Sequence, residues 1–196
     1  MHATNQVSQG NYDYATELLV QCLLGDPGNP IYVQSFVSTL QKKYGQNKKG
    51  AFLAQLKERG ARAALKKALS MGDWDGAIRN GIAVLKVNPW DVATLKSLAT
   101  ACEGVAARGD GPSHSGYADC ELFYLKCAFE TTPWDLDVSS QLGIALGKRN
   151  RFDEAIDFWR RVEQGRPGDE EAPLAIAALA VTKTLLWREE RERGGG

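Results

Sequence analysis

Cysteine and histidine are the residues of this chain whose types could ligate a metal or act as nucleophiles. The four cysteines are Cys22, Cys102, Cys120 and Cys127. No two of them form a C-x-x-C pair, and neither His2 nor His114 completes a spacing typical of zinc ligands. All but Cys120 lie inside apolar helical patterns, where a cysteine behaves as a small buried hydrophobic residue. We therefore expect no metal site, and we expect free thiols, which fit a reducing compartment such as the cytoplasm.

Sequence motifs for catalysis are absent from the chain. It contains no G-x-S-x-G, no phosphate-binding loop that ends in Gly-Lys-Ser/Thr, no H-E-x-x-H and no G-x-G-x-x-G. His114 has a serine on either side, but geometry rather than adjacency in sequence defines a catalytic Ser–His pair. The acidic run 169–171 is explained by the dipole at the start of a helix. We expect a protein that is not an enzyme and that needs no cofactor.

Positive charge is concentrated in one segment of a chain whose net charge is zero. Residues 42–67 contain nine basic residues and one acid, Glu58, so this segment carries +8 and the remainder carries −8. The segment could contact the phosphates of a nucleic acid or the carboxylates of an acidic peptide. Only two aromatic residues, Tyr44 and Phe52, interleave with the basic ones, and the chain as a whole is neutral. These features favour the peptide and leave nucleic acid as an alternative.

The helices that must position these side chains are predicted by a pattern that repeats along the sequence. Three segments, 12–15, 74–77 and 152–155, align without gaps, and each has an aromatic residue, then Asp, then Ala three residues after the aromatic. A proline follows 12 residues after each of these alanines. Mostly apolar residues recur six, nine, ten and thirteen residues after these prolines and after Pro133, which places them on one face of a helix.

The pattern predicts an all-α chain. The expected helices are 3–8, 12–25, 31–44, 48–58, 60–71, 75–87, 92–107, 117–130, 136–149, 153–164 and 170–191. Asp75 and Asp153 stand where an N-cap or first-turn acid favours the second helix of a pair. Residues 109–116 have the composition of an inserted loop. Between residues 44 and 58 the aromatic–Asp–Ala turn and the exit proline are missing, so the helix there must be short or merge with the next one.

Residues 136–169 match a known repeat signature best. The matching residues are Leu142-Gly143, Leu146, Phe152, Ala155, Trp159 and Pro167, and Pro133 precedes Pro167 by 34 residues. At these residues the sequence resembles the tetratricopeptide repeat (TPR) family, over nearly the whole chain. The resemblance implies antiparallel helix pairs stacked into a right-handed superhelix with a concave groove that binds a protein or peptide. It implies one domain over 1–196 with units at about 1–29, 30–59, 60–91, 92–135 and 136–169, and a capping helix at 170–193.

The resemblance also implies which side chains would face a ligand, because the first helix of each unit lines the groove in this family. Carried onto this chain, the groove residues are Gln34, Ser38, Arg59, Arg62, Lys66, Lys96, Ser97, Thr100, Ser140 and Gln141, with Ile144 beside them. The middle of such a groove is cationic and suits an acidic side chain, a phosphate or a C-terminal carboxylate on an extended peptide. The asparagines of the family's carboxylate clamp are missing, and the basic residues equally fit a solvated helix face.

A different kind of function is also open. The chain could be a structural or regulatory segment of a larger multidomain protein. Trp90 and Trp134 stand on nearly duplicated exit turns and would mark a partner or self-association patch if exposed, but packing between units is the favoured explanation. Trp187 fits either a lid on the final apolar face or an interface. No apolar run approaches the ~20 residues of a membrane helix, so we expect no membrane contact. The oligomeric state stays open.

Overall fold

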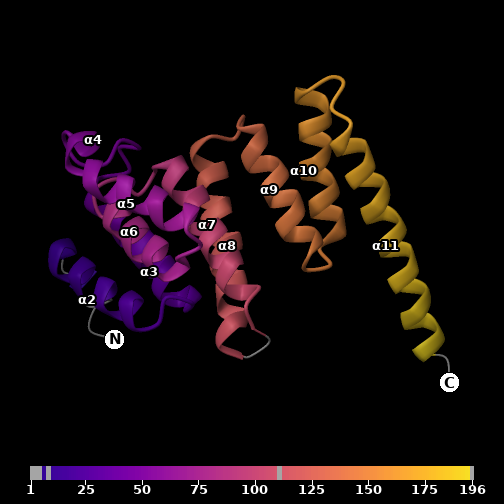
Figure 1. Ribbon diagram of the computed structural model, residues 1–196, viewed down its shortest axis with the longest axis horizontal. Helices are drawn as coiled ribbons and strands as arrows, with labels where there is room; N and C mark the ends of the chain where they lie inside the picture. Colours follow the sequence, from indigo (N-terminus) through magenta and orange to yellow (C-terminus); the bar gives the residue numbers. More distant parts are fainter. Residues whose placement is uncertain (1–5, 8–9, 110–111, 195–196) are drawn as a thin grey trace. The chain divides into compact units, whose positions relative to one another are not determined.

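The computed structural model describes residues 6–7, 10–109 and 112–194, and within these ranges every regular element is an α-helix (Figure 1). The prediction of an all-α chain is confirmed for the described residues. The chain divides into two compact units, Met1–Thr131 and Thr132–Gly196, each with buried apolar residues of its own. His2 and most of the helix expected at 3–8 lie outside the described residues, as does the side chain of His114.

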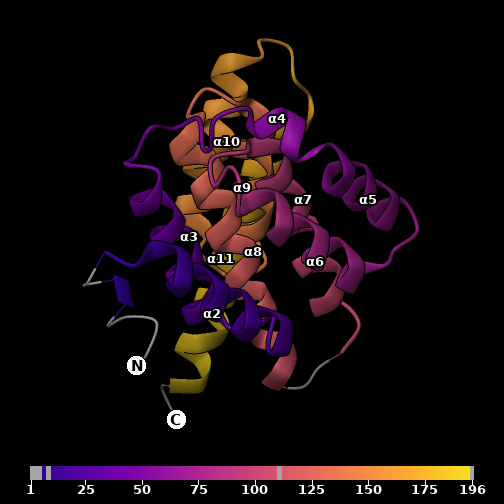
Figure 2. The same cartoon turned by 90° about the vertical axis from the view of Figure 1, so that its left-hand side faces the viewer.

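The first unit is built from helical hairpins (Figure 2). Its helices are α2 (Tyr12–Gly25), α3 (Pro30–Lys43), α4 (Ala54–Lys57), α5 (Arg59–Ser70), α6 (Trp74–Leu85), α7 (Val92–Ala106) and α8 (Pro112–Thr131). α5 pairs with α6, α7 pairs with α8, and α7 also packs against α5 and α6. The hairpin of α2 and α3 packs through α3 on α8. The irregular stretch between α3 and α5 links the hairpin of α2 and α3 to that of α5 and α6, and the two hairpins meet where Lys86, just after α6, pairs with Glu17 of α2.

Side-chain caps set the starts of three helices in this unit. Asn29 accepts hydrogen bonds from backbone N–H groups at the start of α3, Asp73 does so for α6, and Asp91 does so for α7. Such caps satisfy amides that have no partner within the helix. Pro30 fills the first position of α3, where its missing N–H is not needed. These helix starts are local consequences of the sequence.

Glycines mark the closest approaches between helices of the first unit. Gly81 of α6 is buried, and a Cβ atom placed on it would lie 2.6 Å from Cδ2 of Leu98 in α7. A Cβ atom on Gly116 of α8 would overlap the carbonyl oxygen of Gly28, in the turn between α2 and α3. A larger residue at either position would force the Leu98 side chain or the turn at Gly28 to shift.

The second unit consists of α9 (Leu136–Gly147), α10 (Phe152–Gly165) and α11 (Glu171–Gly194), with α10 packed against both α9 and α11. Trp159 and Val162 of α10 form a core with Ala172 of α11. A Cβ atom on Gly143 of α9 would lie 2.6 Å from Nε1 of Trp159. The small residue in α9 therefore lets the large indole of α10 pack directly against the α9 backbone.

The C-terminal part of α11 extends past the start of α10 (Figure 1). Lys183 Nζ lies 2.5 Å from Oδ1 of Asp153, in the first turn of α10. Further along α11, Leu185 and Trp187 are exposed. The Trp187 ring, 64% exposed, has the Arg191 guanidinium 5.5 Å from its centroid. Trp187 is therefore not a lid on the final apolar face.

The helix expected at 48–58 is short, as the missing turn and exit proline indicated: the chain is irregular until the single turn of α4, so the predicted start at residue 48 is wrong. Gln46, Lys48 and Leu53 all have positive φ angles, which interrupt a right-handed helix. The Asn47 side chain accepts hydrogen bonds from two backbone amides that follow it, in place of helical hydrogen bonds.

Two further expectations are corrected by the structure. The segment 109–116 is not a loop throughout, because α8 already begins at Pro112, and proline is well suited to the first position of a helix. Cys22 is exposed rather than buried, although it follows the buried Leu19 by three residues. Cys102 and Cys127 are buried as expected, and so is Cys120.

Two glycine-to-alanine substitutions test the packing of the helices. We expect Gly143→Ala to lower the free energy of unfolding by about 1–2 kcal/mol, because crowding of Trp159 outweighs the gain in helix propensity. Gly60→Ala is the matched control in α5, where a Cβ atom would meet no other atom within 4 Å. It should raise stability by up to about 1 kcal/mol. Urea denaturation followed by circular dichroism measures both, and equal stabilisation by both would contradict the packing of Trp159 on Gly143.

Candidate functional site

The cationic residues expected in the groove lie on α5 in two different environments. Arg59 and Lys66 are exposed and, seven residues apart, lie on the same side of the helix. Leu65 and Ala68 are buried and hold α5 to the rest of the unit. Arg62 lies between the two exposed cations in sequence but is only partly exposed. This difference in burial separates the role of Arg62 from that of its neighbours.

The Arg62 guanidinium bridges two carboxylates. Its Nε donates to Oε2 of Glu58 at 2.8 Å, and its Nη2 also contacts that oxygen. On its other side, Nη1 and Nη2 donate to Oδ1 and Oδ2 of Asp91 at 3.0 and 2.6 Å. Asp91 Oδ1 also accepts from the backbone N–H of Thr94 at 2.9 Å, which caps α7. One guanidinium therefore ties the start of α5 to the start of α7.

Glu58 is the buried member of this cluster. Its side chain is fully buried, and its Oε1 has no hydrogen-bond partner among the described residues. Burial raises the pKa of the Glu58 carboxyl above its usual 4.5, while the hydrogen bonds and positive charge of Arg62 act in the opposite direction. A buried carboxylate of this kind is strongly destabilising without a cation beside it. Most donors of Arg62 are consequently used within the protein rather than offered to a ligand.

Arg59 and Lys66 are not used in this way. Within the described part of the chain, neither side chain forms an ion pair or a hydrogen bond. α5 contains no acidic residue, and the preceding acid, Glu58, is buried against Arg62. The outer face of α5 thus presents positive charge to solvent with no nearby carboxylate on the same helix to neutralise it.

The predicted residues of α7 lie on a helix that packs against α5. Lys96 and Ser97 are partly buried, and Thr100 is exposed. Thr100 Oγ1 donates to the carbonyl oxygen of Lys96 at 3.2 Å. The structure therefore brings the expected residues of α5 and α7 together on neighbouring helices of one unit.

The predicted residues of α3 lie in a different place. Gln34 and Ser38 line a hollow of about 510 Å³ between α3 and α8, together with Phe123, Lys126 and Glu130 of α8. Ser38 Oγ donates to the carbonyl oxygen of Ser35 in its own helix. The two residues are thus grouped with α8 rather than with the cations of α5.

Ser140 and Gln141, the remaining predicted groove residues, belong to α9 in the second unit. Ser140 is partly buried and its Oγ donates to the carbonyl oxygen of Asp137 at 3.0 Å. Gln141 is partly buried, and its Oε1 lacks a hydrogen-bond partner within the described residues. Ile144 is 42% exposed on the same helix. These residues form a partly apolar face of α9.

The two tryptophans of the duplicated exit turns differ in the structure. Trp90 is buried, at 7% exposure, and its backbone N–H donates to Oδ1 of Asn88. Trp134 is 77% exposed. The same three-residue pattern, Pro-Trp-Asp, therefore gives a core residue at one turn and a surface residue at the other.

The described residues were also searched for a metal site and for a membrane-spanning helix. No group of three or more His, Cys, Asp or Glu side chains in them is arranged to hold a metal ion. None of the described helices combines the length and the apolar character that a membrane span requires.

Sequence reasoning missed the partners of the predicted residues. Asp91 carries a visible signal for a helix N-cap, but nothing in the sequence pairs it with Arg62, 29 residues earlier. The α8 residues that face Gln34 and Ser38 were also missed, because α3 and α8 are far apart in the chain. Long-range partners of this kind carry no local sequence signal.

Known structures resemble the whole chain or most of it. The first TPR of Spaghetti (RPAP3), bound to the HSP90 peptide SRMEEVD, matches with a TM-score of 0.55 and 16% identity, over 65% of this chain and 93% of that one. MamA matches with a TM-score of 0.53 and 17% identity, over 98% of this chain and 96% of MamA. TTC0263, a TPR protein of Thermus thermophilus, matches with a TM-score of 0.51 and 18% identity, over 92% and 78%. No family model and no curated protein sequence matches the chain.

The Arg62 cluster can be tested with a double-mutant cycle. Arg62→Ala should lower the free energy of unfolding by about 2–3 kcal/mol, because it leaves Glu58 buried without a cation. In the Glu58→Gln variant, Arg62→Ala should lower the free energy of unfolding by at least about 1 kcal/mol less than it does in the native chain. Arg59→Ala, the control on the exposed side of α5, should change stability by less than about 0.5 kcal/mol. Additive effects of the Arg62 and Glu58 changes, measured by urea denaturation, would show that the two side chains are not coupled.

The pH dependence of stability tests the burial of Glu58. Because the pKa of Glu58 is higher in the folded state than its usual 4.5, the folded state binds this proton more tightly than the unfolded state. Its contribution to stability is then full below pH 4.5 and is lost as the pH rises through the folded pKa. The stability of the native chain minus that of Glu58→Gln should fall over this range and then level off. Thermal unfolding of both proteins across the range measures it, and a difference that rises with pH would contradict the raised pKa.

Proposed function

We propose that this chain, which has the fold of the tetratricopeptide-repeat proteins, is a protein-interaction module that binds an extended acidic peptide. The binding surface is the outer face of α5 together with the adjoining face of α7 in the first unit. The all-α repeat fold expected from the sequence is confirmed by the structural matches, whereas the ligand and the site are our proposal.

The observation that carries the proposal is the pair of exposed, unneutralised cations on α5. Arg59 and Lys66 lie two helical turns apart, about 10 Å along the helix axis. An extended peptide rises about 3.3 Å per residue, so acidic side chains a few residues apart along a peptide can reach both cations. The Arg59 guanidinium can hold a carboxylate with two parallel hydrogen bonds, and the Lys66 ammonium acts as a point charge.

Arg62 supports this surface without being part of it. Its ion pairs with Glu58 and Asp91 hold α5 against the start of α7, and this fixes the direction in which Arg59 and Lys66 project. Removal of Arg62 should therefore weaken binding through loss of structure, whereas removal of the exposed cations should weaken binding alone. Arg62 is a positioning residue in this proposal.

The adjoining face of α7 offers smaller polar groups. Thr100 is exposed, and the partly buried Ser97 lies three residues before it on the same side of the helix. Hydroxyl groups can donate to or accept from the backbone of an extended peptide. The combination of cations on one helix and hydroxyls on the next fits a ligand with acidic side chains and an exposed backbone.

The structural matches support a peptide ligand of this kind. The first TPR of Spaghetti (RPAP3) is bound to the peptide SRMEEVD, which contains two glutamates and ends in an aspartate. At 16% identity this likeness concerns the fold. The acidic character of the ligand proposed here rests on the charge of α5 in this chain.

A charge-reversal variant tests the proposal. A short fluorescent peptide rich in Glu and Asp, with a free C-terminal carboxylate, should bind the native chain and be released by salt. Arg59→Glu/Lys66→Glu should weaken this binding by about tenfold or more, because each exposed cation is replaced by a repelling charge. Fluorescence anisotropy measures the affinity, and the version of the peptide with Gln and Asn in place of its acids should bind weakly.

The matched control is Arg79→Glu/Arg160→Glu, which makes the same change of charge at exposed positions on α6 and α10. It should keep most of the affinity for the peptide. If both double variants lose the same amount of affinity, the assignment of the binding site to α5 is wrong, because net charge alone would then account for the binding. Tighter and more steeply salt-dependent binding of a single-stranded RNA than of the peptide would favour nucleic acid instead.

A further inference from the structure

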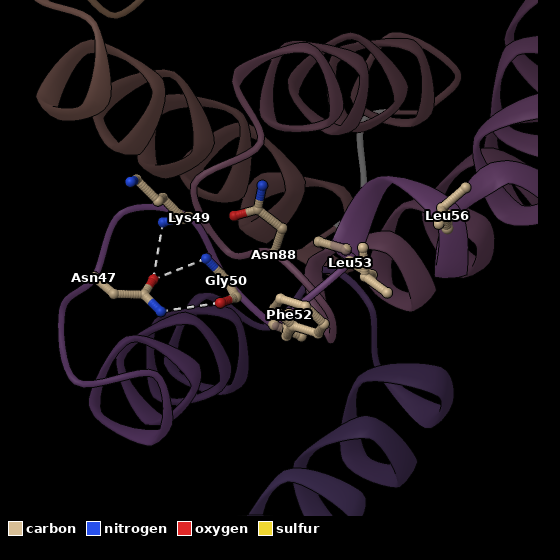
Figure 3. A pocket seen from close by; sticks show the side chains of 9 residues that line it. Asn47, Lys49, Gly50, Phe52, Leu53, Leu56 and Asn88 are labelled. Carbon is tan, nitrogen blue, oxygen red and sulfur yellow. Dashed lines mark hydrogen bonds between the residues drawn. The ribbon is translucent and has the colours of Figure 1, made fainter.

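Three large apolar side chains are exposed within five residues of the chain, in and just before α4. Phe52 is 85% exposed, Leu53 is 54% exposed and Leu56 is 59% exposed. Figure 3 shows Phe52 and Leu53 side by side and Leu56 further along the same segment. Single exposed apolar residues are common on protein surfaces, but a cluster of three on one short segment is a feature of interaction sites.

The backbone beside this cluster is fixed to the end of α6. Ala51 N donates to the carbonyl oxygen of Val87 at 2.8 Å. Gly50 has a φ of +74°, and a Cβ atom on it would lie 2.7 Å from Cα of Asn88, so only glycine fits there. These contacts hold the two residues before Phe52 against the body of the first unit.

Asn47 fixes the other end of the same turn. Its Oδ1 accepts from the backbone N–H groups of Lys49 and Gly50, both at 2.8 Å, and its Nδ2 donates to the carbonyl oxygen of Gly50 at 2.9 Å (Figure 3). Leu53 has a φ of +57°, a left-handed conformation that a leucine rarely adopts. The segment is therefore held in a strained, anchored conformation with its apolar side chains outward, although apolar side chains gain by burial.

The anchored segment borders an open hollow of about 820 Å³. Phe52, Leu53 and Leu56 supply its apolar wall, and Asn88 lies beside them. Asn88 Oδ1 accepts from the backbone N–H of Trp90, and its Nδ2 is left to donate to a ligand carbonyl. The hollow is large enough for one or two large side chains of a bound peptide.

The charges around the hollow are positive. Lys49 is the one charged residue that lines it among the described residues, and Lys48 next to it is exposed. Arg59, three residues after Leu56, is also exposed, and the acid between them, Glu58, is buried with Arg62. A ligand that places an apolar side chain in the hollow would meet cations on its flanks, which favours acidic neighbours.

We propose that this hollow binds a large apolar side chain of the same acidic peptide, so that the partner is a segment in which Phe, Leu or Trp is flanked by Asp or Glu. This inference rests on the proposed function, because it names the apolar part of the peptide whose acids bind α5. Leu56 precedes Arg59 by three residues, so the hollow lies at the start of the cationic face of α5. A lipid surface is the less favoured partner, because a concave site with an amide donor suits a peptide better than a flat bilayer.

The test compares two peptides that differ only in their apolar residues. The first peptide contains one Phe and one Leu, each flanked by Glu or Asp. The second peptide has the same sequence with Ser in place of the Phe and the Leu. By fluorescence anisotropy the first should bind the native chain at least about tenfold more tightly than the second. Phe52→Ser/Leu56→Ser should remove this preference and leave the weaker binding of the second peptide unchanged. Both substituted residues are exposed, so the variant should fold normally.

Ile31→Ser/Leu174→Ser is the matched control, since both residues are 70% exposed and lie outside the hollow. It should keep the full preference for the first peptide. Equal binding of both peptides to the native chain would overturn this inference and leave the proposed function intact. Failure of both peptides to bind would overturn both. Binding to phosphatidylserine vesicles that depends on Phe52, without any preference between the peptides, would assign the cluster to a membrane and overturn the inference.

Discussion

The arrangement of the first unit depends on the guanidinium of Arg62 between two carboxylates. Glu58 is buried, and a buried carboxylate is strongly destabilising without a cation beside it. The same guanidinium holds Asp91, which caps α7, so the starts of α5 and α7 are fixed with respect to each other. The exposed face of α5, and every proposal about what binds there, depends on this link.

The cluster also explains why the strongly basic segment 42–67 is not uniformly available to a partner. Lys43 is paired with Asp13 of α2 at 2.6 Å, and Arg62 is paired twice within the unit. These cations hold helices together, and their charge is partly neutralised where it lies. Arg59 and Lys66 lie on the same side of α5 as Arg62 but are exposed, and within the described residues neither of them forms an ion pair. Burial and partners, rather than the number of basic residues, decide which charges can serve binding.

The irregular segment between α3 and α5 is a second feature that sets the first unit apart. Between α3 and α5 the chain forms the single turn of α4, and Phe52, Leu53 and Leu56 are exposed there. The hydrogen bond from Ala51 to Val87 anchors the segment without covering these side chains. An apolar cluster next to exposed cations results, and this combination distinguishes the first unit from a stack of regular hairpins.

The sequence by itself determined the elements whose causes are local. Asn29, Asp73 and Asp91 cap helices through amides two or three residues away, and the spacing of apolar residues predicted most of the helices that the structure contains. Only the tertiary structure decided which helices became neighbours. It therefore decided that Arg62 meets Asp91, that Gln34 faces α8 and that Cys22 is exposed. The physical reason is that burial and ion pairing depend on residues brought together from distant parts of the chain, which no local spacing specifies.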